Sequence, residues 1–232
     1  MRLYDADQNA LEALMGSGIG LMLEVPRTSL QSLGSDPSIA DSWVQTNVAP
    51  YASCLDFRYV VVGNEIHPTD PEAGSVLPAM QNVHNALRLA NLDQIKVSTA
   101  IDTTLVTNSY PPSNGIFTNS AYMNPIINFL EHNNSPLLVT IYPYFAYVEN
   151  PHDINLNYAL FTAPATVVTD YNNGLNYQNL FDCWVWPKNS YYVTRGKKNG
   201  PKNMIMLQGQ EDWAKYNLLC FSPAAFMRVD PH

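Results

Sequence analysis

The sequence is poor in charged residues, in cysteine and in long apolar runs, and each scarcity excludes a class of protein. Only 14% of the 232 residues are charged, and the formal net charge is −8, so binding to a nucleic-acid phosphate backbone is not expected. The three cysteines have no C-x-x-C spacing and predict neither a zinc site nor a disulfide framework. No apolar run approaches about 20 residues, so no membrane-spanning helix is expected.

The chain is rich in hydrophobic residues and in uncharged polar residues. At 46% hydrophobic residues, the chain can form one sizeable domain with its own core. Fourteen tyrosines and many asparagines indicate a surface of hydroxyls and amides, which suits neutral ligands such as sugars. A polar surface without any ligand explains the same composition. The opening residues MRLYDADQNA include no apolar core or cleavage site, so no signal peptide is predicted there.

Strand-like and helix-like segments alternate along most of the chain. Short apolar runs predict strands near 1–4, 20–25, 57–65, 95–101 and 137–145. Apolar residues at helical spacing lie between these runs, as at Val76, Met80, Val83 and Leu87. Continuous apolar strands that alternate with helices are typical of parallel sheets. No Gly-x-Gly-x-x-Gly loop follows a strand, which disfavours a dinucleotide cofactor and favours a (β/α) barrel.

The segment RYVVVGNEI, residues 58–66, ends a strand on a carboxylate. In a (β/α) barrel, functional side chains lie at the carboxyl ends of the strands. Glu65, with Asn64 before it, is therefore a candidate catalytic residue. A turn residue followed by a solvated charge is the alternative explanation.

The composition changes near residue 182. Up to Asp182 the chain has five Lys and Arg against seventeen Asp and Glu, whereas from Cys183 onward it has seven against three. We therefore divide the chain into residues 1–182, a partial barrel, and residues 183–232, a divergent tail. An ordinary basic subdomain remains an alternative for the tail, in which NMIML (203–207) is a possible strand.

Six segments together resemble the plant glucan endo-1,3-β-glucosidases, family 17 of the glycoside hydrolases, a pathogenesis-related group. They are MRLYDADQNALEAL, YVVVGNEI, KVSTAID, SYPPSNGIF, PLLVTIYPYFAY and YALFT. The resemblance implies a (β/α)8 barrel that hydrolyses β-1,3-glucan with retention and needs no metal or cofactor. It also implies a monomer that is secreted to the cell wall or the vacuole.

The resemblance also assigns roles to residues of this chain. Glu65 matches the proton donor of the family. Asn64, Tyr4 and Tyr142 match substrate-binding positions beside it, and Phe145 matches a wall of a further subsite. Thr140 stands where the family usually has Asn.

The chain also departs from the family. The family's first βα unit has no counterpart, and the strands after residue 182 are replaced, including the nucleophile in its Glu-Ser-Gly-Trp-Pro-like segment. Glu211, in QGQEDW, is a poor substitute because its neighbours do not match. Two hypotheses follow: a β-1,3-glucanase, or an inactive chain that is a β-glucan-binding fragment or the product of a mis-spliced gene. A second carboxylate beside Glu65 would distinguish them.

Overall fold

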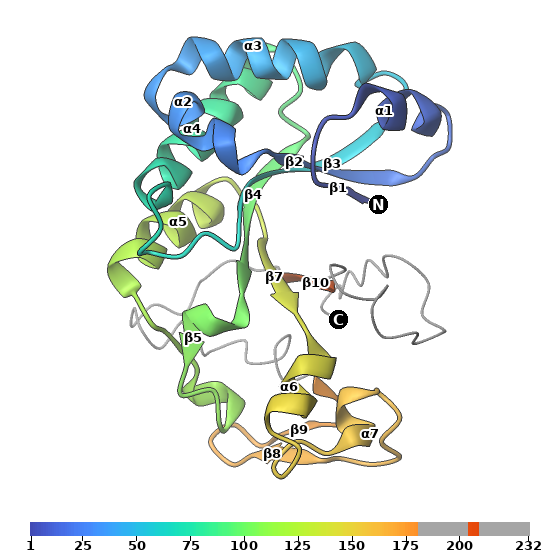
Figure 1. Cartoon of the computed structure of the whole chain (residues 1–232), viewed down its shortest axis with the longest axis vertical. Coiled ribbons are helices and arrows are strands. Elements are labelled where there is room, and N and C mark those ends of the chain that lie inside the picture. The colour runs from blue at the N-terminus through green and yellow to red at the C-terminus, as the bar shows by residue number, and fades with distance from the viewer. Residues whose placement is uncertain (181–203, 209–232) are drawn as a thin grey trace.

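The structure is a computed structural model that describes residues 1–180 and 204–208. Its centre is a six-stranded, all-parallel sheet in the order β1-β2-β3-β4-β7-β10 (Figure 1). The strands are β1 (Arg2–Leu3), β2 (Gly20–Val25), β3 (Asp56–Asn64), β4 (Lys96–Asp102), β7 (Leu137–Ile141) and β10 (Met204–Gln208). Helices connect them, so the architecture is the predicted partial (β/α) barrel.

The connecting helices cover the outer face of the sheet, as Figure 1 shows. They are α1 (Gln8–Leu14), α2 (Leu30–Ser35), α3 (Pro37–Asn47), α4 (Ala73–Leu89) and α5 (Ser120–His132), with short 3₁₀ turns at η1 (Arg27–Ser29) and η2 (Ala49–Tyr51). Asp36 caps α3 by accepting from the Ser38 N–H, and Pro37 follows at the first position of the helix.

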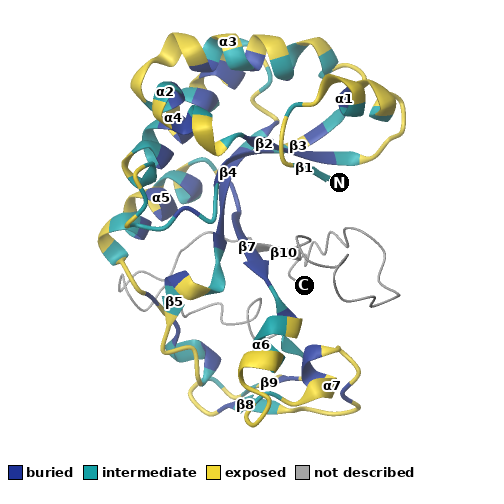
Figure 2. Cartoon of the chain, viewed as in Figure 1, coloured by how far each residue is buried: buried dark blue, intermediate teal, exposed yellow. Residues whose placement is uncertain are grey.

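Two apolar layers lie on the two faces of the sheet. The larger one packs the strands against the helices and includes fully buried residues such as Leu23, Val60 and Met80. On the inner face, a smaller cluster contains Met22, Val61, Ala100 and Leu138. Figure 2 shows the strands buried and the outward sides of the helices exposed. Because the strands are buried on both faces of the sheet, their sequences are continuous apolar runs.

The predicted strand 137–145 is too long. β7 ends at Ile141, and α6 (Pro143–Glu149) begins two residues later, with Tyr142 at its N-cap. Pro143 has no N–H to donate to a neighbouring strand, and its fixed φ suits the first turn of a helix. Tyr142 therefore lies at the junction of strand and helix.

A smaller layer of short elements follows β4 and β7. It contains η3 (Thr103–Leu105), η4 (Pro112–Asn114), α7 (Leu156–Ala159), the antiparallel ribbon β5 (Val106–Thr107) with β6 (Ile116–Phe117), and the ribbon β8 (Val168–Asp170) with β9 (Leu175–Tyr177). Figure 1 shows this layer at the end of the molecule opposite α3.

The possible strand at 203–207 exists as β10 and pairs with β7 in parallel, with Gln208 level with Ile141. The division of the chain at residue 182 stays a prediction, because most of the tail lies outside the described residues. Within 1–180 and 204–208, no helix combines the length and the hydropathy needed to cross a membrane.

Candidate active site

The end of β3 has an irregular backbone that presents Glu65. The pairing of β3 with β4 shifts register between Val61 and Asn64, and Gly63 has a positive φ of 86°. Glu65 itself has a φ of 52°, which is uncommon for a residue with a side chain. Its N–H still donates to the Ala100 carbonyl of β4 at 2.8 Å, which fixes the turn to the sheet. Bulges and strained φ values of this kind cluster at functional sites.

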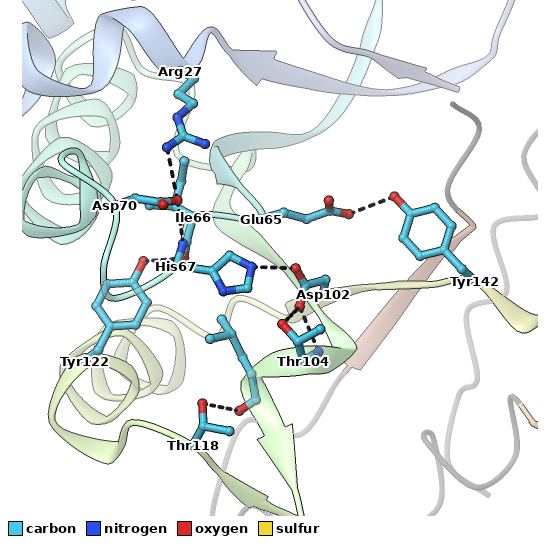
Figure 3. Close-up of polar contacts among 11 residues, drawn as sticks. Arg27, Glu65, Ile66, His67, Asp70, Asp102, Thr104, Thr118, Tyr122 and Tyr142 are labelled. Atoms are coloured by element: carbon cyan, nitrogen blue, oxygen red, sulfur yellow. Dashed lines mark hydrogen bonds and ion pairs between the residues drawn. The ribbon is translucent and has the colours of Figure 1, made fainter. Parts of the chain in front are cut away.

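Glu65 and Tyr142 meet at the carboxyl edge of the sheet, as predicted. The Tyr142 hydroxyl donates to Glu65 Oε1 at 3.1 Å (Figure 3). The two residues follow β3 and β7, which flank β4 in the sheet. Both side chains are half-buried, so the carboxyl has a fixed partner and remains accessible.

Asn64 and Tyr4 are joined through Arg2, a residue that the sequence analysis missed. Arg2 Nη2 donates to Asn64 Oδ1 at 2.6 Å and to Glu24 Oε1 at 2.5 Å, and the guanidinium carbon lies 4.5 Å from the centre of the Tyr4 ring. Because the Asn64 oxygen is occupied, the amide nitrogen is the group left to donate to a ligand. The buried Arg2–Glu24 pair thus orients Asn64 and supports Tyr4. An Arg two residues before Tyr4 in an apolar strand was the signal available in the sequence.

The loop after Glu65 is held by hydrogen bonds from neighbouring elements. Tyr122 of α5 donates its hydroxyl to the Ile66 carbonyl at 3.1 Å, and His67 Nε2 lies 2.8 Å from Asp102 Oδ2 at the end of β4 (Figure 3). Burial, with a contribution from Asp70, raises the pKa of Tyr122 to about 12, so its hydroxyl keeps the proton that it donates. The sequence analysis predicted none of these contacts.

An ion-pair cluster fixes the far end of the same loop. Asp70 accepts from the His67 N–H at 2.9 Å, and this bond, with the charge of Arg27, lowers the pKa of Asp70. Arg27 also pairs with Glu72 at 2.8 Å, and its hydrogen bond lowers the pKa of that carboxyl. The segment from Glu65 to Glu72 is therefore joined to η1, β4 and α5, so the direction of Glu65 is set by several parts of the barrel.

Phe145 lies beside Tyr142 on α6. Their ring centres are 5.8 Å apart, and Tyr144 packs edge-on against Phe145 at 5.6 Å. Three aromatic rings therefore form one cluster that touches the Glu65 carboxyl through Tyr142, and such rings can stack against sugar rings. Thr140 is only 1% exposed, and its hydroxyl finds no hydrogen-bond acceptor or donor among the described residues.

One candidate from the sequence remains, Glu211. Glu211 is outside the described residues, so the structure does not place it. Within residues 1–180 and 204–208, no group of three or more His, Cys, Asp and Glu side chains is arranged to hold a metal ion.

A parallel half-barrel with a glutamate and an asparagine at the carboxyl end of one of its strands defines the class of (β/α)-barrel proteins. Residues 1–215 match the family model described as Glycosyl hydrolases family 17. The chain belongs to this family.

The relatives and neighbours agree with this assignment. A probable glucan endo-1,3-beta-glucosidase of Arabidopsis thaliana is 55% identical over 185 residues, which cover 78% of this chain and 53% of the relative. A glucan endo-1,3-beta-glucosidase of Vitis vinifera is 48% identical over 219 residues, covering 92% of this chain and 62% of the relative. The chain thus spans between about half and two thirds of the length of these curated relatives.

Solved structures confirm the fold. A plant β-glucan endohydrolase superposes with a TM-score of 0.79 at 39% identity, over 91% of this chain and 68% of the other. The β-1,3-glucanase and allergen CJP38 of Cryptomeria japonica pollen gives a TM-score of 0.78 at 34% identity, over 88% of this chain and 64% of the other.

Proposed function

We propose that this chain carries the proton-donor half of a retaining endo-1,3-β-glucanase site and binds β-1,3-glucan there without hydrolysing it measurably. The observation that carries the proposal is the 3.1 Å hydrogen bond between the Tyr142 hydroxyl and Glu65 at the carboxyl edge of the sheet. Phe145 packs against Tyr142, and Asn64 precedes Glu65 and is joined to the Tyr4 ring through Arg2, which further supports the proposal.

Each residue has a task in glycoside cleavage. Glu65 would give a proton to the leaving glycosidic oxygen as the bond breaks. The Asn64 amide nitrogen would donate to a sugar hydroxyl next to the reacting carbon, a contact that strengthens in the transition state. Tyr4, Tyr142 and Phe145 would stack against the C–H faces of the glucose rings.

A retaining mechanism also needs a second carboxylate, and no residue of the chain clearly matches it. Retention needs it about 5–5.5 Å from the first, on the opposite face of the sugar. By the resemblance, β3 is the fourth barrel strand, so β10 occupies the position of the seventh, which carries the nucleophile in the family. The last residue of β10 is Gln208, level with Ile141. An amide cannot form the covalent glycosyl intermediate, which supports the absence of hydrolysis.

An assay of reducing ends released from laminarin tests the catalytic part. We expect no measurable release by the 232-residue chain. Release at the level of a complete glucanase, abolished by Glu211→Gln, would show that the tail supplies the nucleophile. A release abolished by Gln208→Ala instead would assign a role to the end of β10.

A binding measurement with a laminari-oligosaccharide tests the other part. We expect Tyr142→Ala to weaken binding by about tenfold, since it removes one stacking ring and the partner of Glu65. Glu12→Gln, on the exposed face of α1, is a matched surface control and should bind as the wild type does. Equal affinity of all three proteins would refute this site.

Origin from a mis-spliced gene is a second candidate explanation, favoured by the change of charge near residue 182. In that case the site at Glu65 is the remainder of a secreted or vacuolar monomeric glucanase. Sequencing the transcript across the codons for residues 175–232 tests it. A continuous reading frame without a retained intron would contradict it.

A further inference from the structure

A second group of tyrosines is exposed on the two short ribbons, apart from the residues around Glu65. The side chains of Tyr110, between β5 and β6, and Tyr171, at the turn between β8 and β9, are 73% and 86% exposed. We call the segments 106–117 and 168–177 the ribbon surface. Figure 1 shows β5 and the β8–β9 ribbon at the end of the molecule opposite α3. An exposed tyrosine presents an apolar ring face and a hydroxyl group to a ligand.

Hydrogen bonds join the two ribbons close to both tyrosines. Asp170, which is fully buried, accepts from the Ser113 N–H at 2.7 Å and from the Ser113 hydroxyl at 2.9 Å. The Asn172 amide donates to Asn114 Oδ1 at 2.9 Å. Asp170 and Asn172 flank Tyr171, so its backbone is fixed on both sides. Binding of a ligand to this surface therefore costs little conformational entropy in the backbone beneath it.

The prolines on the other ribbon restrict the chain next to Tyr110. Pro111 and Pro112 lie between Tyr110 and Ser113, the residue bonded to Asp170. Because proline fixes φ, few backbone rotations separate the Tyr110 ring from this anchor. Both rings are thus carried by the same rigid support.

Apart from the buried Asp170, the ribbon surface has no formally charged residue, although the whole chain has a net charge of −8. Residues 103–130 include no Asp, Glu, Lys, Arg or His, and residues 154–180 include only Asp170, whose two oxygens are buried and hydrogen-bonded. A phosphate, an acidic peptide or a basic peptide would find no opposite charge here. Exposed phenol rings and the exposed Asn108 amide instead fit a neutral ligand rich in hydroxyl groups.

We propose that the ribbon surface, through Tyr110 and Tyr171, is a contact site for a neutral β-glucan chain outside the site at Glu65. This goes beyond the proposed function because it needs neither Glu65 nor Tyr142. Only the choice of the β-1,3-linked polymer as the probe rests on that function. A polymer held here and at Glu65 together would bind more tightly than a short oligosaccharide that fills one site.

Co-sedimentation of the 232-residue chain with insoluble β-1,3-glucan tests the site. We expect Tyr110→Ala/Tyr171→Ala to lower the affinity for the polymer by at least about tenfold, since it removes two stacking rings. Both side chains are exposed, so the thermal unfolding midpoint should not change. Leu89→Ala, a control at an apolar side chain that is 75% exposed on α4, should sediment as the wild type does.

A parallel titration with laminaritriose separates this proposal from the preceding one. Binding of the trisaccharide that persists in the tyrosine double variant, with loss of polymer binding, supports both sites. If the wild type does not bind the trisaccharide and the double variant loses polymer binding, the ribbon surface is supported and the site at Glu65 is refuted. Sedimentation of the double variant equal to the wild type, or no sedimentation of the wild type, overturns the ribbon surface.

Discussion

At the scale of single residues, Gly63 decides how Glu65 is presented. Its φ of 86° is a conformation that residues with a side chain rarely adopt. A Cβ at this position would lie 3.2 Å from Thr99 Oγ1, and the same hydroxyl donates to the Gly63 carbonyl at 2.9 Å. Position 63 therefore requires a residue that can adopt a positive φ and that has no side chain to collide with β4.

We predict that Gly63→Ala destabilises the protein by about 1–3 kcal/mol, because it combines an unfavourable φ with the contact to Thr99. Gly74→Ala is the matched control: it lies in the first turn of α4, where an added Cβ meets no atom within 4 Å. There alanine should stabilise by up to about 1 kcal/mol. Urea unfolding measures both, and equal midpoints would contradict the account of Gly63.

Arg2 is the second residue whose role only the structure shows. Its side chain is 10% exposed and that of Glu24 is 4% exposed, so the pair is largely removed from water. We predict that Arg2→Met costs about 3–5 kcal/mol, because it removes the cation that compensates the charge of the buried Glu24 carboxylate. Arg2→Met/Glu24→Met should recover most of this loss in a denaturant titration. A double variant as unstable as the single one would assign the loss to another contact of Arg2.

At the scale of elements, the packing of α4 against α5 contains a titratable ring. His84 of α4 meets Phe129 of α5 edge-on, with ring centres 5.8 Å apart. Burial, followed by the charges of Arg88, Lys96 and His132, lowers the pKa of His84 from 6.5. Protonation is therefore less favourable in the folded chain than in the unfolded one.

The sign of the resulting pH dependence follows from this shift. The unfolded chain takes up the proton first, so stability that is present above pH 6.5 is lost as the pH falls through the lower folded pKa. We predict that His84→Gln reduces the loss of thermal stability between about pH 7 and pH 5. His152 serves as the control, because its neighbour Asp153 raises its pKa, and His152→Gln should keep the full loss. Parallel curves for wild type and His84→Gln would refute the role of His84.

At the scale of the whole molecule, the half-barrel and the ribbon surface differ in how they are held. The large apolar layer holds the half-barrel and extends to Phe117 of β6, whereas the two ribbons are joined to each other by polar contacts to Asp170. We predict that Asp170→Ala, which leaves the Ser113 and Asn172 N–H groups without an acceptor, accelerates hydrogen exchange in 106–117 and 168–177. Exchange in β2, β3 and β4 should stay unchanged.

Asp153→Ala is the control for this measurement, because Asp153 is an exposed carboxylate in the same part of the chain. Faster exchange throughout the sheet of the Asp170 variant would mean that the ribbons and the half-barrel unfold together.

The sequence by itself determined the class of fold and the place of Glu65. Continuous apolar runs separated by helical stripes require strands that are buried on both faces, and the polar residues that end them then meet at one edge. For this reason the 20–25, 57–65 and 95–101 strands and the pairing of Glu65 with Tyr142 could be predicted. The strand predicted at 137–145 was too long. Its aromatic residues are compatible with a strand, but they also fit the helix that begins at Pro143.

Only the tertiary structure decided which side chains orient the site. Arg2, Tyr122 and Asp102 lie between 35 and 62 residues from their partners in the loop around Glu65, and no local pattern encodes such contacts. The joining of Tyr110 and Tyr171 through Asp170 likewise depends on two ribbons that are 57 residues apart in the chain. Hydrophobic periodicity fixes which face of an element is buried, whereas the partners of polar groups depend on how the elements pack.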